Sequence, residues 1–536
     1  MKLSRLTLGF GPSSRLLHHA LTVSAIALCL LTPSHATTLR VANQGDALSM
    51  DPHSLAEAVQ LAFTGNIYEG LVAYDQQLKL VPALAQKWSI AKPTVWRFEL
   101  RKGVKFHDGQ ALSAEDVVFS IDRARGEGSD MSGNLSSISA VRKVDANTVE
   151  VETKAPNPIL PNLLATIYIM NRAWAESNGA VKPVDRRKGT ENTASFKANG
   201  TGPYRLRERQ PGVRTVLARN GNYWGKIEGN VTDVVFQPIG NDGTRVAALL
   251  SNEVDLIDPV PLQNVAHLSA NKQLKVMQGP ESRVVFLGFD QKRDELLYSN
   301  VKGKNPFKDK RVRQAVYQAI DTATIIDKVM EKAARPAALM VAEGMQGYSA
   351  ALDKRLPFDP AASRRLLAEA GYPDGFEVTL NCPNDRYVND ARICVAVAAN
   401  LAHVGVKVKV QAETKALYFP RVLKRDTSFF MVGWIPAGYD AHNALALLMA
   451  TPNGANGSWN MGAYSNAKLD ALTQTIGSET DLVKRTKLMQ EALELHRDDF
   501  GHIPLHQQAL AWGMRANVEA VQRSDNYMFF RWISVR

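Results

Sequence analysis

One stretch of the sequence combines residue types that line small-molecule pockets. Residues 429–432 (Phe-Phe-Met-Val) predict a short buried strand that stops at Gly433. A glycine at a strand end lets another molecule approach the backbone, and the indole of Trp434 offers a flat wall for stacking. The loop that follows adds polar side chains, namely Asp440, His442 and Asn443. The pattern is typical of a binding pocket, although, taken alone, a core tryptophan followed by an ordinary surface loop explains it better.

Motifs of catalysis or metal binding do not accompany this stretch. The sequence contains no G-x-S-x-G elbow, no H-E-x-x-H pair and no phosphate-binding G-x-x-x-x-G-K-[ST] loop. His442 alone does not predict a nickel site, because a metal needs several converging ligands. We therefore expect no metal, no cofactor and no catalytic residues. An exported hydrolase acting on peptide or glycan stays open as the alternative, since carboxylate geometry is invisible in a sequence.

The N-terminus resembles a secretory signal. Lys2, Arg5 and Arg15 precede an apolar segment at residues 20–31, and Ser34-His35-Ala36 fits a small-x-small cleavage site. We expect residues 1–36 to be a signal peptide that is cleaved after Ala36, which leaves a soluble protein in the periplasm.

Cysteine usage follows from this export. Cys29 lies inside the apolar segment, so cleavage leaves only Cys382 and Cys394. In an oxidising compartment an even pair predicts a disulfide, with two buried free thiols as the less favoured alternative.

Length and composition indicate a multidomain globular protein. The 536 residues exceed a single hydrophobic core, so we expect two or three domains. The formal net charge of +11 comes from scattered basic residues, which favours a solvated surface and no nucleic-acid partner. A strand at 376–380, a helix at 391–403 and a strand at 406–410 predict a parallel βαβ unit, hence an α/β fold.

Several motifs, in order along the chain, carry a resemblance to a known family. They include a strand at 96–101, a turn at Asp108-Gly109 and a helix capped by Ser113 and Asp116. The further matching stretches are residues 200–204, 220–224, 305–315 and 464–466. From about residue 38 to the C-terminus the chain resembles the extracytoplasmic solute-binding proteins of peptide/nickel-type ABC importers (solute-binding protein family 5), which include dipeptide- and oligopeptide-binding proteins.

The resemblance implies the type II periplasmic binding protein fold of the large cluster, in which two α/β lobes close on a ligand. Transferred to this sequence, the first lobe comprises residues 37–75, 190–288 and 507–536. An extra inserted domain comprises residues 76–189, and the second lobe residues 289–506. Residues 284–290 and 505–512 are the expected crossing strands between the lobes, and an ordinary central strand is the alternative for each.

The resemblance also implies ligand-binding residues. Relatives have an aspartate after the Gly-Trp pair that binds the ligand's α-ammonium. Here that position is Ala437. Asp440 takes this role only if the loop backbone brings it to the same place. Arg386 and Tyr387 match a loop near the ligand carboxylate; the alternative is a surface ion pair of Arg386 with Asp385 or Asp390. The full set of expected ligand contacts is Leu48, Ser49, Met50, Arg386, Tyr387, Gly433, Trp434, Asp440, His442, Asn443, Trp459 and Asn460.

The implied function is capture of a peptide or peptide-like solute and its delivery to an ABC permease with its ATPases. We expect a monomer. Because Ala437 replaces the usual acid, an anionic or N-blocked ligand fits these residues better than a simple dipeptide. A peptide-binding chaperone or a sensor subunit would share the fold and differ only in its partners.

Overall fold

The computed structural model describes residues 36–454 and 456–536. By internal contacts the chain divides after Thr37, and residues Thr38–Arg536 form one unit, which is described here. The predicted signal peptide falls almost entirely outside the described residues. Within the described part, no helix has both the length and the apolar character needed to span a membrane.

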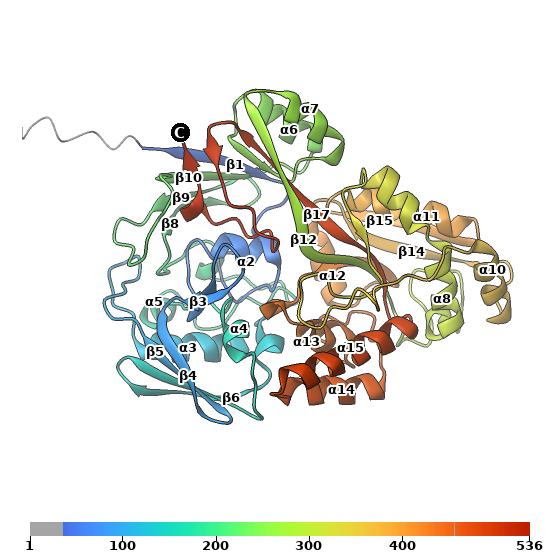
Figure 1. Cartoon of the computed structure of the whole chain (residues 1–536), viewed down its shortest axis with the longest axis horizontal. Helices are drawn as coiled ribbons and strands as arrows, with labels where there is room; N and C mark the ends of the chain where they lie inside the picture. Colours follow the sequence, from blue (N-terminus) through green and yellow to red (C-terminus); the bar gives the residue numbers. More distant parts are fainter. Residues whose placement is uncertain (1–35, 455) are drawn as a thin grey trace, which may run out of the picture. The chain divides into compact units, whose positions relative to one another are not determined.

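The unit is built on an eleven-stranded mixed sheet whose centre is two long antiparallel strands, β12 (Leu274–Phe289) and β17 (Ile503–Arg515). Figure 1 shows them crossing diagonally between the two halves of the sheet. On one side follow β11 (Leu256–Asp258), β1 (Thr38–Asn43), β10 (Asp233–Pro238), β9 (Arg214–Arg219) and β8 (Tyr204–Gln210). On the other side lie β16 (Phe429–Trp434), β14 (Phe376–Pro383) and β15 (Val406–Glu413), and the two-residue β13 (Arg335–Pro336) pairs with β17. Both predicted crossing segments overlap these two central strands.

The predicted βαβ unit is present. Strands β14 and β15 are parallel, with Phe376 opposite Val406, and α11 (Asp390–Ala402) connects them. Gly405, in the turn between α11 and β15, has a φ of +86°, which a residue with a side chain rarely adopts. Strand β16, expected to stop at Gly433, continues to Trp434 because both residues pair with β12.

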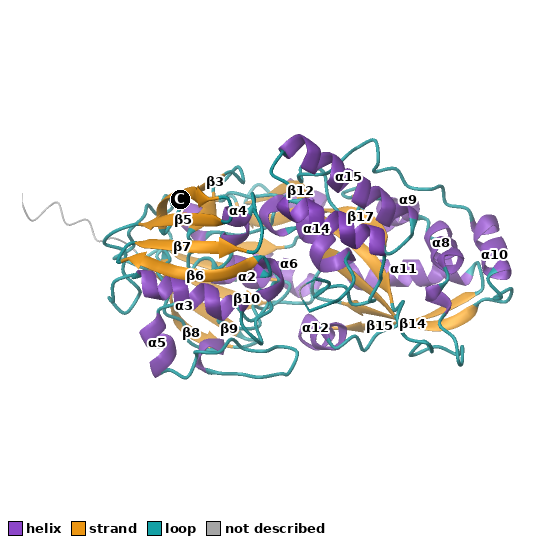
Figure 2. Ribbon diagram, turned by 90° about the horizontal axis from the view of Figure 1, so that it is seen from below, coloured by secondary structure: helices purple, strands orange, loops and turns teal. Residues whose placement is uncertain are grey.

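A separate four-stranded antiparallel sheet forms between residues 85 and 153. It consists of β4 (Ala85–Lys92), β5 (Val95–Leu100), β7 (Thr148–Thr153) and β6 (Ile138–Asp145). Helix α3 (Ala114–Arg125) runs alongside this sheet (Figure 2) and contacts β6 and β7. The predicted cap of α3 is confirmed, since the Ser113 side chain accepts from the Asp116 backbone N–H and Asp116 bonds back to Ser113.

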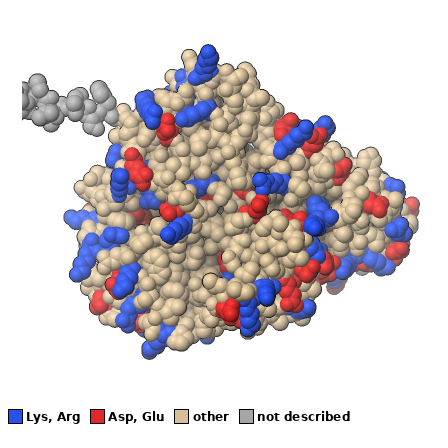
Figure 3. Space-filling view, in the orientation of Figure 1, with Lys and Arg blue, Asp and Glu red and all other residues tan. Residues whose placement is uncertain are grey.

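The remaining elements cover these sheets. Helix α2 (Ala58–Thr64) ends before Gly65. The other helices and short strands are β2 (Val72–Tyr74), β3 (Leu80–Pro82), α4 (Leu160–Leu164), α5 (Arg172–Ser177), α6 (Asp242–Leu250), α7 (Val265–Ala270), α8 (Lys310–Ala319), α9 (Thr322–Thr324), α10 (Pro360–Glu369), α12 (Lys415–Leu423), α13 (Ala441–Ala444), α14 (Ala467–Ser478), α15 (Leu482–Asp498), β18 (Val518–Glu519) and β19 (Ser534–Val535). On the face shown in Figure 3, basic and acidic side chains are interspersed, in keeping with the scattered charge of the sequence.

Candidate functional site

A cavity of about 740 Å³, including the part open to solvent, lies beside β12 and β16. Its walls come from both sides of the sheet. The side of β1 contributes the first turn of α2 and residues near the C-terminus, and the side of β14 contributes the loops after β14 and β16. The lining side chains used below are Glu57, Tyr74, Asn134, Arg283, Arg386, Tyr387, Phe419, Trp434, Ala437, Tyr439, Trp459, Asp525 and Tyr527.

Arg386 and Tyr387 lie on a loop that a covalent bond and a buried carboxylate hold in place. A disulfide joins Cys382, near the end of β14, to Cys394 in α11, which confirms the predicted pairing. The Asp390 carboxylate accepts hydrogen bonds at 3.0 Å from the backbone N–H groups of Arg386 and of Tyr387. The loop is therefore fixed without using the Arg386 side chain, which is left to face the cavity.

The Arg386 side chain pairs with Glu57, an acid from the β1 side of the two central strands. Its Nε lies 2.5 Å from Oε1 of Glu57, and Nζ of Lys415 lies 3.7 Å from Oε2 of the same carboxylate. Glu57 also caps α2 by accepting from the N–H groups of Val59 and Gln60. Burial opposes ionisation, but the charges of Arg386 and Lys415 outweigh it and lower the Glu57 pKa to about 2. Glu57 is therefore an anion at neutral pH, held between Arg386 and Lys415.

This ion pair leaves donors unused. Among the described residues, the Nη atoms of Arg386 donate no hydrogen bond, and the buried ammonium of Lys415 has no hydrogen-bond partner. The Arg386 side chain is only 6% exposed, so its free donors face the cavity and not bulk water. A buried guanidinium with free Nη groups is suited to a carboxylate, which it binds through paired hydrogen bonds.

A second arginine reaches the cavity from an irregularity in β12. The register of β12 against β17 shifts between Pro280 and Val284, and Arg283 lies in this bulge. Bulges commonly redirect side chains beside functional sites. Arg283 pairs with buried Glu281 at 2.8 Å, and its guanidinium lies 5.7 Å from the Tyr387 ring, against which the Arg386 guanidinium lies at 4.9 Å.

Gly433 has protein side chains beside it, where the sequence predicted the approach of a ligand. A Cβ on this residue would lie 2.8 Å from the Tyr387 ring and 2.9 Å from the Arg283 side chain. Its missing side chain therefore makes room for these two residues of the cavity wall as well as for any ligand.

Two tryptophans form the aromatic wall. The rings of Trp434 and Trp459 lie 5.1 Å apart at an angle of 54°, and Phe419 meets Trp459 edge-on at 6.0 Å. The Trp434 indole N–H donates to Oδ1 of Asn443 at 3.1 Å. The Trp459 indole nitrogen has no partner among the described residues, so it is available to an acceptor on a ligand.

The structure brings five of the twelve expected contacts to this cavity, namely Arg386, Tyr387, Gly433, Trp434 and Trp459. Arg386 pairs with neither Asp385 nor Asp390 through its side chain. The other seven residues lie elsewhere, and their positions explain why.

Asp440 is occupied by another partner. Its carboxylate receives Nη1 of Arg485 at 2.5 Å and Nη2 at 2.9 Å, and both side chains are buried. It also accepts from the His442 backbone N–H, as the cap of α13. Ala437 does line the cavity, so the position where relatives carry an acid is apolar here, and Asp440 does not reach it.

His442, Asn443 and Asn460 support the cavity loops or line other space. Asn443 accepts from the Ala437 backbone N–H at 2.8 Å as well as from Trp434, and with His442 it lines a separate polar cavity. Asn460 is fully buried, and its side-chain amide forms hydrogen bonds with backbone groups of Ala450 and Tyr464. Asn443 thus fixes the segment after Trp434, and Asn460 fixes the separate segment that contains Trp459.

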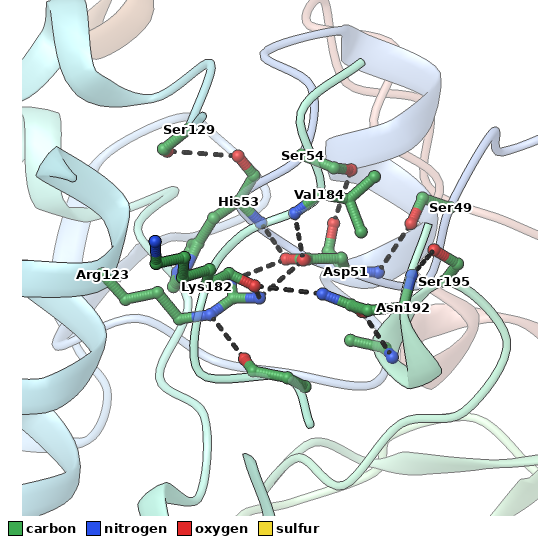
Figure 4. Close-up of polar contacts among 12 residues, drawn as sticks. Ser49, Asp51, His53, Ser54, Arg123, Ser129, Lys182, Val184, Asn192 and Ser195 are labelled. Carbon is green, nitrogen blue, oxygen red and sulfur yellow. Dashed lines mark hydrogen bonds and ion pairs between the residues drawn. The ribbon is translucent and has the colours of Figure 1, made fainter. Parts of the chain in front are cut away.

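The loop after β1 that contains Leu48, Ser49 and Met50 lies against a buried polar network (Figure 4). The Arg123 guanidinium donates to both carboxylate oxygens of Asp51, at 2.8 and 2.6 Å. Ser49 accepts from the Asp51 N–H. Together with Leu48 and Met50, Ser49 stays outside the lining of the cavity described above.

A histidine completes this network. Burial, and then the charge of Arg123, lower the His53 pKa to about 3, so the imidazole is neutral. Its Nδ1 accordingly accepts from Arg123, and its Nε2–H donates to the Tyr168 carbonyl at 2.9 Å.

Sequence reasoning missed several wall residues, chiefly Glu57, Arg283, Tyr439, Asp525 and Tyr527. A signal for Arg283 was present, because the charged Glu-Ser-Arg run interrupts an otherwise apolar strand. The acids offered no such signal. Asp525 is taken up by Arg523 and by the Tyr439 hydroxyl, which donates to it at 2.6 Å.

Comparison with known proteins places this geometry in a class. Residues 79–456 match the family model of bacterial extracellular solute-binding proteins, family 5 (middle region). The chain belongs to this family, a family of solute-binding proteins that do not catalyse reactions. The family expected from the sequence, the two-lobed α/β fold and the absence of enzymatic function are thereby confirmed.

Particular relatives cover nearly the whole chain. It is 26% identical to the glutathione-binding protein GsiB of Escherichia coli O157:H7, over 90% of this chain and 91% of that protein. Its fold is similar to that of the ABC transporter-associated periplasmic binding protein DppA of Helicobacter pylori in complex with the peptide STSA (TM-score 0.82, 24% identity, 93% of this chain and 98% of that chain). It is equally similar to AgaA of A. tumefaciens R10 in complex with agropinic acid (TM-score 0.82, 22% identity, 93% and 99%).

Proposed function

We propose that this protein is the periplasmic receptor of an ABC importer, and that it holds a small acidic, peptide-like solute in the cavity between β12, β16 and α2. The observation that carries the proposal is the Arg386 guanidinium, which is buried, faces the cavity and retains free donors beside Arg283. Relatives named for glutathione, a peptide and agropinic acid support this ligand class.

The cavity offers little to a ligand ammonium. The two carboxylates in its lining, Glu57 and Asp525, are each neutralised by an arginine, and Ala437 supplies no acid. A buried ammonium without a countercharge costs several kcal/mol. We therefore propose a ligand whose amine is blocked or absent and whose carboxylate lies on Arg386.

The proposal includes the partners and the cellular place expected from the sequence. The signal peptide at residues 1–36 is removed after Ala36, and the mature chain acts as a monomer that delivers its solute to the permease and ATPases. The strands on the two sides of β12 and β17 belong to the two lobes, with the four-stranded sheet in the inserted domain at residues 76–189. Closure of the lobes brings Glu57 against Arg386.

The decisive experiment is to identify what the protein carries. Mature protein is purified without refolding and denatured, and the released small molecules are identified by mass spectrometry. Calorimetry then compares free and N-acetylated di- and tripeptides. Recovery of an acidic or N-blocked compound, with tighter binding of acetylated peptides, supports the proposal; tight binding of free peptides alone overturns the ligand class.

A further inference from the structure

A second cavity lies directly behind one wall of the first. It measures about 670 Å³, including its open part, and the two cavities share Tyr74, Thr166, Tyr439 and Tyr527 in their linings. The shared wall is well fixed, because the rings of Tyr74 and Tyr439 meet edge-on at 4.7 Å. None of the functional assignments made above uses this second space.

The second cavity is lined mainly by aromatic rings. Besides the three shared tyrosines it has Tyr68, Tyr168, Trp224 and Phe529. Trp224 is held in place from two directions, since its indole N–H donates to Glu69 at 2.8 Å and the Arg101 guanidinium lies 4.3 Å from its ring. Rings of this kind favour a flat aromatic group, which stacks against them or meets them edge-on.

Two of the three charged residues in the lining are already satisfied. The Glu69 carboxylate accepts from Thr201, Tyr223 and Trp224 at 2.7–2.8 Å. Arg523 donates to both oxygens of Asp525 and to the backbone carbonyls of Tyr74 and Asp75. Both are therefore largely satisfied within the protein.

The third charged residue, Arg531, is different. Its guanidinium lies 4.7 Å from the Trp532 ring and 5.4 Å from the Phe529 ring. Its one side-chain hydrogen bond, to the Tyr223 hydroxyl, is 3.3 Å long, and its Nε is buried without a partner. Within the described residues no carboxylate forms an ion pair with it within 4 Å, and Glu69 acts on its charge only from farther away, across the Tyr223 hydroxyl that both contact. Such a guanidinium is suited to an incoming carboxylate.

We infer that the second cavity is a further ligand subsite, which takes an aromatic ring bearing a carboxylate. The ring lies among Trp224, Phe529 and the shared tyrosines, and the carboxylate lies on Arg531. The inference is independent of what occupies the first cavity.

The test uses 3-phenylpropionate as the probe, with 3-phenylpropanol as its neutral counterpart, in calorimetry on the mature chain. Saturable binding of the acid is expected, with the alcohol and the Arg531→Met variant weaker by about tenfold or more and Arg531→Lys retaining part of the affinity. The surface variant Arg142→Met is the matched control. Thermal unfolding of each variant establishes that it is folded.

A crystal structure of the wild-type protein with the probe locates the ring without any variant. A ring between Trp224 and Phe529 supports the inference. Absence of binding, equal binding of the alcohol, or a loss of binding on Arg386→Met in place of Arg531→Met overturns it. The last outcome would put the probe in the first cavity and leave the proposed function intact.

Discussion

Asp51–Arg123 and Glu57–Arg386 are buried ion pairs whose acids lie six residues apart in the chain, but they differ in how fully they are satisfied. Arg123 meets Asp51 through two parallel hydrogen bonds and gives its other donors to His53 and to two backbone carbonyls. Arg386 meets Glu57 through one nitrogen and leaves its Nη donors to the cavity.

The difference separates scaffold from binding site. A fully hydrogen-bonded ion pair has nothing left to offer a ligand, so its effect is to fix the loop in which it lies. A buried charge with free donors is costly until something binds it, and the ligand can supply that stabilisation. Burial alone does not distinguish the two, because all four side chains are at most 6% exposed.

The largest effect on stability is expected from Arg123→Met. This substitution leaves Asp51 buried and without a countercharge, and breaking a buried pair in this way costs about 3–5 kcal/mol of unfolding free energy. Urea denaturation measures the change. The matched control is Arg142→Met, which breaks the exposed pair with Glu152 and should cost less than about 1 kcal/mol. Similar losses in the two variants would show that the network is not a stabilising scaffold.

Arg386→Met should show the opposite pattern, with a larger effect on affinity than on stability. Glu57 keeps Lys415 beside it, so the unfolding free energy should fall less than for Arg123→Met. Affinity for an acidic ligand should fall by about 2–5 kcal/mol, or roughly 30-fold to several thousand-fold. Calorimetry with the co-purified solute measures this loss of affinity. The Arg386→Lys variant keeps the charge but not the paired hydrogen bonds, so it tests whether that geometry is needed. A greater loss of stability than of affinity would make Arg386 a scaffold residue.

Much of the fold could be predicted from the sequence, because it follows from local patterns. The alternating and apolar runs located β5, β14, β15 and β16, and the Ser113–Asp116 cap located the start of α3. The disulfide followed from export and an even cysteine count. These signals depend on residues that are close together in the chain, which is why they can be read from the sequence alone.

The site was harder to predict, because its key contacts join residues far apart in sequence. Glu57 and Arg386 are brought together only by the order of the strands in the sheet, and the sequence near either residue does not indicate its partner. Asp440 looked available for a ligand until Arg485, 45 positions away, was seen to occupy it. Which residues can bind a ligand depends on where their side chains point and on whether their hydrogen bonds are already made. Neither property can be read from the spacing of residues in the sequence.

Removal of the disulfide tests whether the Arg386 loop needs its covalent constraint. The bond spans 12 positions, and loops of this size contribute roughly 3 kcal/mol in the chain-entropy model. A Cys382→Ser/Cys394→Ser variant should therefore unfold at lower urea concentration and bind the solute more weakly, because the loop between the two positions is less ordered. The Asp51–Arg123 network lies outside this loop. Unchanged affinity would show that Asp390 holds the loop without the disulfide.

The smallest expected effect is in the pH dependence, and it isolates Glu57. Its pKa in the folded protein is about 2, below the ordinary value of 4.5, so its ionisation stabilises the fold fully above about pH 4.5. That contribution, at most about 3 kcal/mol, is lost as the pH falls toward 2.

In the Glu57→Gln variant the folded and unfolded chains no longer differ in proton binding at this position. Between pH 4.5 and 2 the unfolding free energy should therefore fall less steeply than in wild type, by up to about 1.4 kcal/mol per pH unit. Urea titrations at several pH values, with the solute absent, measure the two slopes. The variant also frees Arg386 completely, so an anionic ligand should bind at least as tightly as before at pH 7. Identical slopes combined with weaker binding would mean that Glu57 contacts the ligand directly and is not held as the counter-ion of Arg386.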